Sequence, residues 1–153
     1  MTIKEEILKV YPNAEIVESN SNYSFVTSED SEFEYFINKE DKTIVAVLNH
    51  DFIKECYKCG FIGNMFLEYK EGMNSTNIPL VERYKSFVGK AKVNPVDEFD
   101  FETGLKLARS RALKKYYTYL HKTSQNIFTY LYKCFSMEHN LVNHYSEMIE
   151  KYQ

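Results

Sequence analysis

The C-terminal third of the chain constrains the fold most strongly, because apolar side chains recur there at helical spacing from Phe101 to Tyr152. In the first part they lie three or four residues apart and form one stripe: Phe101, Leu105, Ala108, Ala112, Tyr116 and Tyr119. In the second part the spacing alternates between four and three, which is a heptad seam: Ile127, Leu131, Cys134, Glu138, Leu141, Tyr145, Met148 and Tyr152. Thr123 and Ser124 lie between the two parts and can end one helix and cap the next. The pattern predicts two long helices over residues 101–153, arranged as a helical hairpin.

The first hundred residues have the signals of an antiparallel sheet. Thr2 to Glu5 fit the capping-box pattern and Pro12 is a stop signal, which predicts a short helix at the start. Polar turns separate β-like stretches, which predicts strands at 22–28, 33–38 and 43–49, a weaker strand at 14–18 and a later one at 81–93. Residues 50–79 mix apolar and turn residues, and we interpret them as an insertion.

These patterns predict an α+β fold, with an N-terminal antiparallel β-sheet followed by two long C-terminal helices. We expect a single domain over residues 1–153, with a sheet-rich part over 1–100 that includes the short helix and the insertion, and the helical hairpin over 101–153. The heptad seam is longer than the preceding helix can cover. We therefore expect a homo-dimer or a higher homo-oligomer.

The net charge limits which partners the protein attracts, and the cysteine content indicates its cellular compartment. The net formal charge is −3, which gives no general attraction to duplex nucleic acid or to an anionic membrane. No apolar run approaches the roughly 18 residues that a membrane-spanning helix needs. Three cysteines, without a charged and then apolar leader, indicate a reducing compartment. We expect a cytoplasmic protein.

The sequence has no complete catalytic or metal-binding motif. Cys56 and Cys59 form a CxxC pair, but a structural zinc needs four ligands; only His50 lies near, and Cys134 is on the seam. The four histidines share no catalytic spacing. We expect no metal, no cofactor and no enzymatic activity.

An acidic stretch precedes the first long helix. Asp97, Glu98, Asp100 and Glu102 could hold Mg²⁺ for phosphoester hydrolysis. An N-cap at Asp100, with the other carboxylates near the positive end of the helix dipole, explains the same residues more simply. A metal-dependent nucleotide hydrolase is therefore the less favoured alternative.

The helix start does not explain two nearby arginines. Arg109 lies on one flank of the apolar stripe, while Gly104, Arg111 and Lys115 share the other flank. Glycine at position 104 costs about 1 kcal/mol of helix stability relative to alanine, which indicates that something approaches the backbone there. Aromatic rings and an amide that could stack on or read a base lie just before the helix: Tyr84, Phe87, Asn94 and Phe99.

Residues 87–115, FVGKAKVNPVDEFDFETGLKLARSRALKK, resemble the pattern G-x-A-x-x-x-P-x-D-x-F-D-x-x-x-G-x-x-L-A-x-x-R-A of small phage proteins. The chain looks most similar to the phage anti-Thoeris sponge family, which sequesters cyclic ADP-ribose isomers without degrading them. That family has an N-terminal antiparallel sheet and two long C-terminal helices, and it assembles as dimers or, in some members, hexamers. The helix at 1–12 and the insertion at 50–79 are departures from the family.

The resemblance implies a phage anti-defence protein that binds a cyclic nucleotide immune signal in the infected bacterial host cell. The signal would be a cyclic ADP-ribose isomer or a cyclic oligonucleotide. The ligand-binding residues that it implies are Tyr84 or Phe87 stacking on the base, Asn94 at the base edge, Arg109 and Arg111 at the phosphates, and Lys115 in support. Because the two arginines lie on opposite flanks of one helix, we expect the site to lie between subunits. The alternative is an inhibitor that docks directly on a host defence protein through the seam or the insertion.

Overall fold

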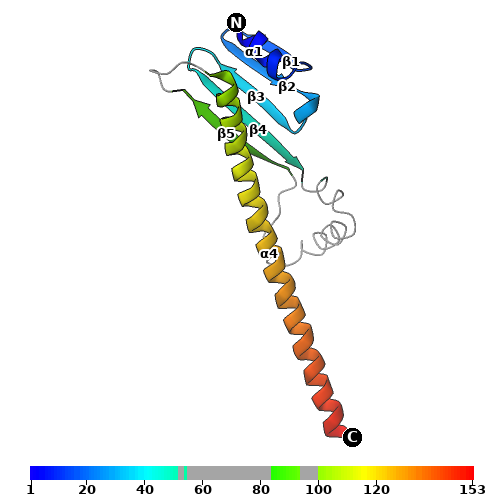
Figure 1. Cartoon of the computed structure of the whole chain (residues 1–153). Coiled ribbons are helices and arrows are strands. Elements are labelled where there is room, and N and C mark those ends of the chain that lie inside the picture. The colour runs from blue at the N-terminus through cyan, green and yellow to red at the C-terminus, as the bar shows by residue number, and fades with distance from the viewer. Residues whose placement is uncertain (52–53, 55–83, 94–99) are drawn as a thin grey trace.

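Five strands form one antiparallel sheet whose spatial order is the chain order. The computed structural model describes residues 1–51, 54, 84–93 and 100–153. The strands are β1 (Glu15–Ser19), β2 (Asn22–Val26), β3 (Phe33–Asn38), β4 (Thr43–Asp51) and β5 (Tyr84–Lys92). The helices are α1 (Ile3–Val10), the short 3-10 helix η1 (Ser28–Asp30) and α4 (Phe101–Tyr152) (Figure 1). The predicted α+β class, with an N-terminal antiparallel sheet and a helical C-terminal part, is confirmed.

The predicted elements of the first half are found within a few residues of their expected bounds. The capping box at the start of α1 is present, with Thr2 and Glu5 bonding each other's backbone N–H groups. β2 ends at Val26, before the end of the predicted strand, because the side chain of Thr27 caps η1 by accepting from the N–H of Glu29. The expected insertion lies mostly outside the described residues.

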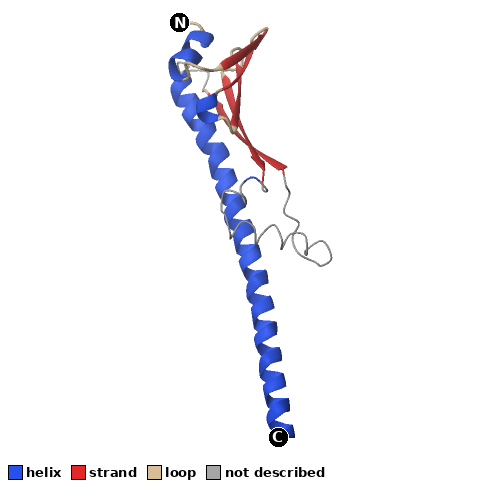
Figure 2. Cartoon of the chain, turned by 90° about the vertical axis from the view of Figure 1, so that its right-hand side faces the viewer, coloured by secondary structure: helices blue, strands red, loops and turns tan. Residues whose placement is uncertain are grey.

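Both α1 and α4 cover the same face of the sheet, and no described helix covers the other face (Figure 2). Side chains alternate along β3, so that Phe33, Tyr35 and Ile37 are buried under the helices. The core combines these residues with apolar side chains from both helices and the other strands: Ile3, Ile7, Phe25, Ile44, Ala46, Leu48, Phe87, Ala91, Phe101, Leu105, Ala108 and Ala112. The fold is therefore a two-layer arrangement of helices on one sheet face.

The two expected C-terminal helices are joined end to end as one helix, α4, and the expected hairpin turn is absent. The chain has no glycine or proline after Gly104, and Thr123 and Ser124 alone do not stop a helix. Hydroxyl groups elsewhere in α4 are accommodated by bonding back to the preceding turn, as Thr118 does to the carbonyl oxygen of Lys114 at 2.7 Å. The first part of α4 lies on β4 and β5, and the rest projects well beyond the sheet (Figure 1).

Candidate functional site

The described motif residues, 89–93 and 100–112, belong to the end of β5 and the first part of α4, which are in contact. A Cβ atom added to Gly89 would lie 1.9 Å from the carbonyl oxygen of Ala108 and 2.5 Å from the backbone nitrogen of Ala112. A Cβ added to Gly104 would lie 2.9 Å from Cδ1 of Ile44. The small residues of the motif therefore let the helix backbone rest directly on the strands. The close approach expected at Gly104 is made by the sheet of the same chain.

Arg109 is held by a carboxylate from η1. Its Nε donates to Asp30 Oδ2 at 2.9 Å and its Nη2 to Asp30 Oδ1 at 3.3 Å, which is a bidentate pair. Its guanidinium also lies 5.0 Å from the centre of the Phe33 ring. Arg109 therefore ties α4 to η1, and no local sequence pattern links it to Asp30, which lies 79 positions away.

Asp30 also accepts from a buried phenol. The hydroxyl of Tyr35 donates to Asp30 Oδ2, and the Tyr35 side chain is fully buried among the rings of Tyr11, Phe25 and Phe33. Burial, and then the hydrogen bond to Asp30, raises the pKa of Tyr35 above its ordinary value. The three groups form one polar network beneath the helices.

This network predicts a loss of stability at alkaline pH. Tyrosine in the unfolded chain ionises near pH 10, about its ordinary pKa, whereas native Tyr35 keeps its proton. The free energy of unfolding should therefore be unaffected by Tyr35 below about pH 10 and should fall as the pH rises above it. Urea unfolding at a series of pH values measures this slope. Tyr35→Phe should flatten it, whereas Tyr117→Phe, which changes an exposed ring, should leave the parent slope; equal slopes in all three proteins would contradict the expectation.

Arg111 and Lys115 reach from α4 over the free edge of β5. Nη1 of Arg111 donates to the carbonyl oxygen of Lys90, and Nζ of Lys115 donates to that of Val88 at 2.6 Å. Both side chains are exposed, and neither is ion-paired within the part of the chain that the structure describes. We call these two residues the β5-edge cations. They satisfy carbonyl groups of an edge strand, and they hold two positive charges at fixed positions.

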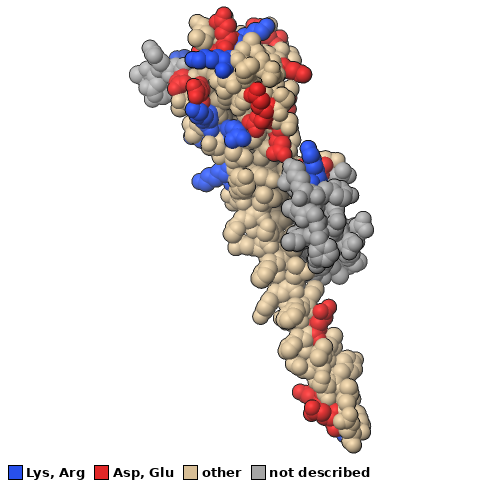
Figure 3. Space-filling model, turned by 45° about the vertical axis from the view of Figure 1, so that its right-hand side comes forward, with Lys and Arg blue, Asp and Glu red and all other residues tan. Residues whose placement is uncertain are grey.

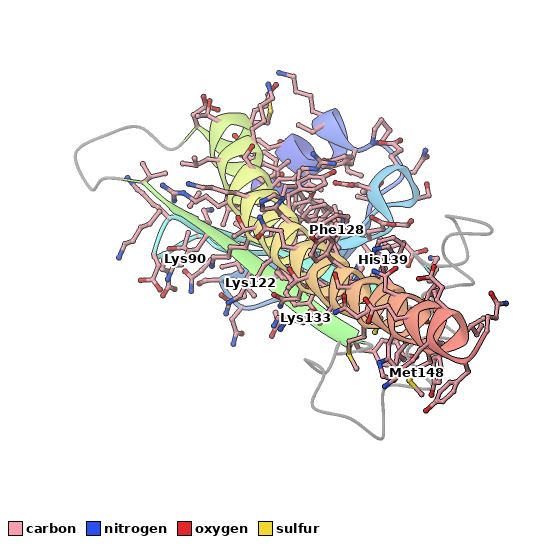
Figure 4. All side chains as sticks on the ribbon, turned by 90° about the horizontal axis from the view of Figure 1, so that it is seen from below. Lys90, Lys122, Phe128, Lys133, His139 and Met148 are labelled. Carbon is pink, nitrogen blue, oxygen red and sulfur yellow. The ribbon has the colours of Figure 1, made fainter. Side chains whose placement is uncertain are left out.

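Further cations continue along the same side of α4. Lys122 and Lys133 follow Lys115 at intervals that return to the same helix face, and Figure 4 shows both on the side of α4 where Lys90 of β5 lies. Nζ of Lys85 lies 4.6 Å from the centre of the Tyr119 ring. Several cations therefore lie on the β5 side of the helix.

Of the predicted aromatic and amide residues, the structure describes Tyr84 and Phe87, and these two differ in burial. Phe87 is buried, and its ring packs against His50, Tyr116 and Tyr119. Its expected role as a stacking surface is therefore wrong within one subunit, because β5 turns this side chain under α4. Tyr84 is 65% exposed at the start of β5. Asn94 and Phe99 lie outside the described residues.

The described carboxylates at the start of α4 contact other groups of the same helix. Asp100 is the N-cap and accepts from the backbone N–H and the hydroxyl of Thr103, which lowers the pKa of its carboxyl. Glu102 pairs with Lys106 at 2.7 Å. Asp97, Glu98 and the CxxC pair lie outside the described residues. Within the described ranges, no group of three or more His, Cys, Asp or Glu side chains could hold a metal ion.

Comparisons with protein-family models, with curated proteins and with solved structures found no match for this chain. Among the described residues, no helix combines the length and the apolar character that crossing a membrane requires.

Proposed function

We propose that the protein binds and sequesters a compact nucleotide anion, a cyclic ADP-ribose isomer or a cyclic oligonucleotide, without converting it. The resemblance of residues 87–115 to the phage sponge family narrows the ligand to an immune signal of this kind. On this proposal the chain is a phage anti-defence protein that acts in the cytoplasm of the infected cell. The single observation that carries the proposal is the geometry of the β5-edge cations.

The β5-edge cations suit an anion because they are fixed before it arrives. Ordering a flexible cationic side chain on binding costs about 0.5 to 1.5 kcal/mol, and a bond to a backbone carbonyl removes most of that cost. Arg111 uses one terminal nitrogen for Lys90, so its other N–H groups remain for a phosphate. Lys115 lies one turn further along the helix and adds a second charge.

The described surroundings of the cations favour binding over chemistry. The nearest motif carboxylates that the structure describes are occupied as the cap of α4 and in a pair with Lys106. Hydrolysis of a phosphoester would need a positioned water and a base, or a metal that holds both. We therefore propose that the ligand is released chemically unchanged.

Heat release of the ligand tests the proposal. The protein would be incubated with cyclic ADP-ribose isomers and with cyclic di- and trinucleotides in the presence of Mg²⁺, separated from free nucleotide, denatured and analysed by mass spectrometry. We expect one class to be retained and to be recovered with its mass unchanged. Recovery of an opened or hydrolysed product would favour the hydrolase, and retention of none of them would favour direct docking on a defence protein.

Removal of one β5-edge cation should weaken binding without unfolding the chain. We expect Arg111→Ala to raise the dissociation constant at least about tenfold, or 1.4 kcal/mol, in calorimetry with the retained nucleotide. The matched control is Lys106→Ala, which removes one cation from the same helix where it is exposed and paired with Glu102. Parent affinity in Arg111→Ala would return this residue to a purely structural role at the β5 edge.

A further inference from the structure

The projecting part of α4 carries a regular apolar stripe that is exposed over most of its length, with Leu120, Ile127 and Cys134 half-buried. With the heptad positions named a to g and Leu131 at position a, the seam occupies a and d: Leu120, Ser124, Ile127, Leu131, Cys134, Glu138, Leu141, Tyr145, Met148 and Tyr152. Position e adds Phe128, Phe135, Val142 and Ile149, each at least 60% exposed. Figure 3 shows this part of the helix with few charged side chains. An apolar stripe of this width is typical of a helix that packs against other helices.

We propose that this stripe, from Leu120 to Tyr152, packs antiparallel against the same stripe of a second copy of the chain. The stripe is about 50 Å long at 1.5 Å per residue, and it keeps one heptad register throughout. A partner must share that period and that length, and a second copy meets both conditions with a closed two-fold contact. The proposal does not depend on the nucleotide ligand.

Glu138 selects the antiparallel orientation. In a parallel pair in register, the two a positions face each other, so two Glu138 carboxylates would meet in the seam. In an antiparallel pair an a position faces a d position, and Glu138 faces Cys134, a small side chain. Cys134 is a free thiol within the described chain. The antiparallel arrangement therefore separates the like charges.

In one antiparallel register, every seam position of the stripe faces a seam position of the partner helix. It places Ser124 opposite Met148, Ile127 opposite Tyr145, and Leu131 opposite Leu141, with Leu120 and Tyr152 at the ends. A shift by one heptad would leave two seam positions of each helix uncovered. Small residues then face large ones at Ser124 and Cys134, as close packing requires.

The distribution of charge along α4 also favours the antiparallel orientation. Residues 111–122 carry Arg111, Lys114, Lys115 and Lys122 and no carboxylate, whereas residues 138–152 carry Glu138, Glu147 and Glu150 against Lys151. An antiparallel pair in this register places Glu150 opposite Lys122, at an interaxial distance of about 8–10 Å, and points the acidic end of each helix towards the cations that precede the stripe of the other. A parallel pair would bring like ends together. The long-range charges and the helix dipoles both favour the antiparallel pair.

The mass in solution tests the association. The full chain should sediment at twice its 18.1 kDa mass at micromolar concentration. Leu131→Glu with Leu141→Glu should raise the dimer dissociation constant at least about 100-fold, because both layers would bury unpaired carboxylates. The matched control is Thr129→Glu with Asn143→Glu, which adds the same charges on the opposite face of the helix. A monomeric parent, or equal dissociation by both double variants, would overturn the proposal.

Cross-linking tests the orientation. In full-length protein with Cys56, Cys59 and Cys134 replaced by serine, mild oxidation of Ser124→Cys with Met148→Cys should give a disulfide-linked dimer. Each single cysteine variant should stay unlinked, because the antiparallel register places neither residue beside itself. Linked dimers from the single variants would show a parallel pair, and no linked dimer from any variant would show that the stripe is not the contact; either result overturns the proposal.

Discussion

Gly89→Ala is expected to lower the free energy of unfolding by about 3 kcal/mol, at the upper end of what overpacking costs. The added methyl carbon would lie 1.9 Å from the carbonyl oxygen of Ala108, and both atoms belong to regular elements that cannot give way separately. Relief requires α4 to lift from β5, which opens the core around Phe87 and Ala112. Urea unfolding followed by circular dichroism measures the change.

The matched control is Gly104→Ala, also on the contact between α4 and the sheet. There the added carbon meets Cδ1 of Ile44 at 2.9 Å, the far end of a side chain that can change rotamer. Alanine also favours the helix by about 1 kcal/mol over glycine, so the net change should be within about 1 kcal/mol of zero. Similar losses at both positions would mean that the helix and the strand are not in backbone contact at Gly89.

The elements of the first half could be predicted from the sequence because their signals are local. A capping box, period-two alternation and polar turns act within a few residues of each other, and the structure has a helix or strand at each such place that it describes. The hairpin could not be predicted correctly. Thr123 and Ser124 permit a break but do not require one, and no glycine or proline follows Gly104 to end the helix.

For the candidate site, the sequence predicted on which side of the helix each cation lies but not which group each cation contacts. The sequence placed Arg109 on one flank of the helix and Arg111 with Lys115 on the other, and the structure agrees, with one flank over η1 and the other over β5. Their partners could not be read from the sequence. Asp30 comes from a distant turn, and the carbonyl groups of Lys90 and Val88 are backbone atoms that any sequence would supply. Glycine at position 104 indicates a close approach to the backbone without naming the group that approaches, which is Cδ1 of Ile44.

The ion pair between Asp30 and Arg109 should contribute more to the free energy of unfolding than to the affinity for the nucleotide. Asp30→Ala is expected to lower the free energy of unfolding by about 3 kcal/mol, because it leaves the Arg109 guanidinium without its carboxylate and removes an acceptor of the buried Tyr35 hydroxyl. Arg109→Ala should cost less, about 1 to 2 kcal/mol, because the Asp30 carboxylate that it leaves unpaired still accepts a hydrogen bond from the Tyr35 hydroxyl.

A double-mutant cycle separates the pair from the packing of each side chain. The double variant Asp30→Ala with Arg109→Ala should be less destabilised than the sum of the single variants by about 1 kcal/mol, since the second change removes the charge that the first left unpaired. Urea unfolding of the four proteins gives this coupling energy, and calorimetry on the same proteins shows whether nucleotide affinity is kept. Additive losses would mean that the two groups are held by other contacts. A loss of nucleotide affinity in Arg109→Ala, with the free energy of unfolding unchanged, would instead place the anion site on the η1 flank of α4. Only a direct contact between Arg109 and the ligand would lower the affinity without lowering the stability.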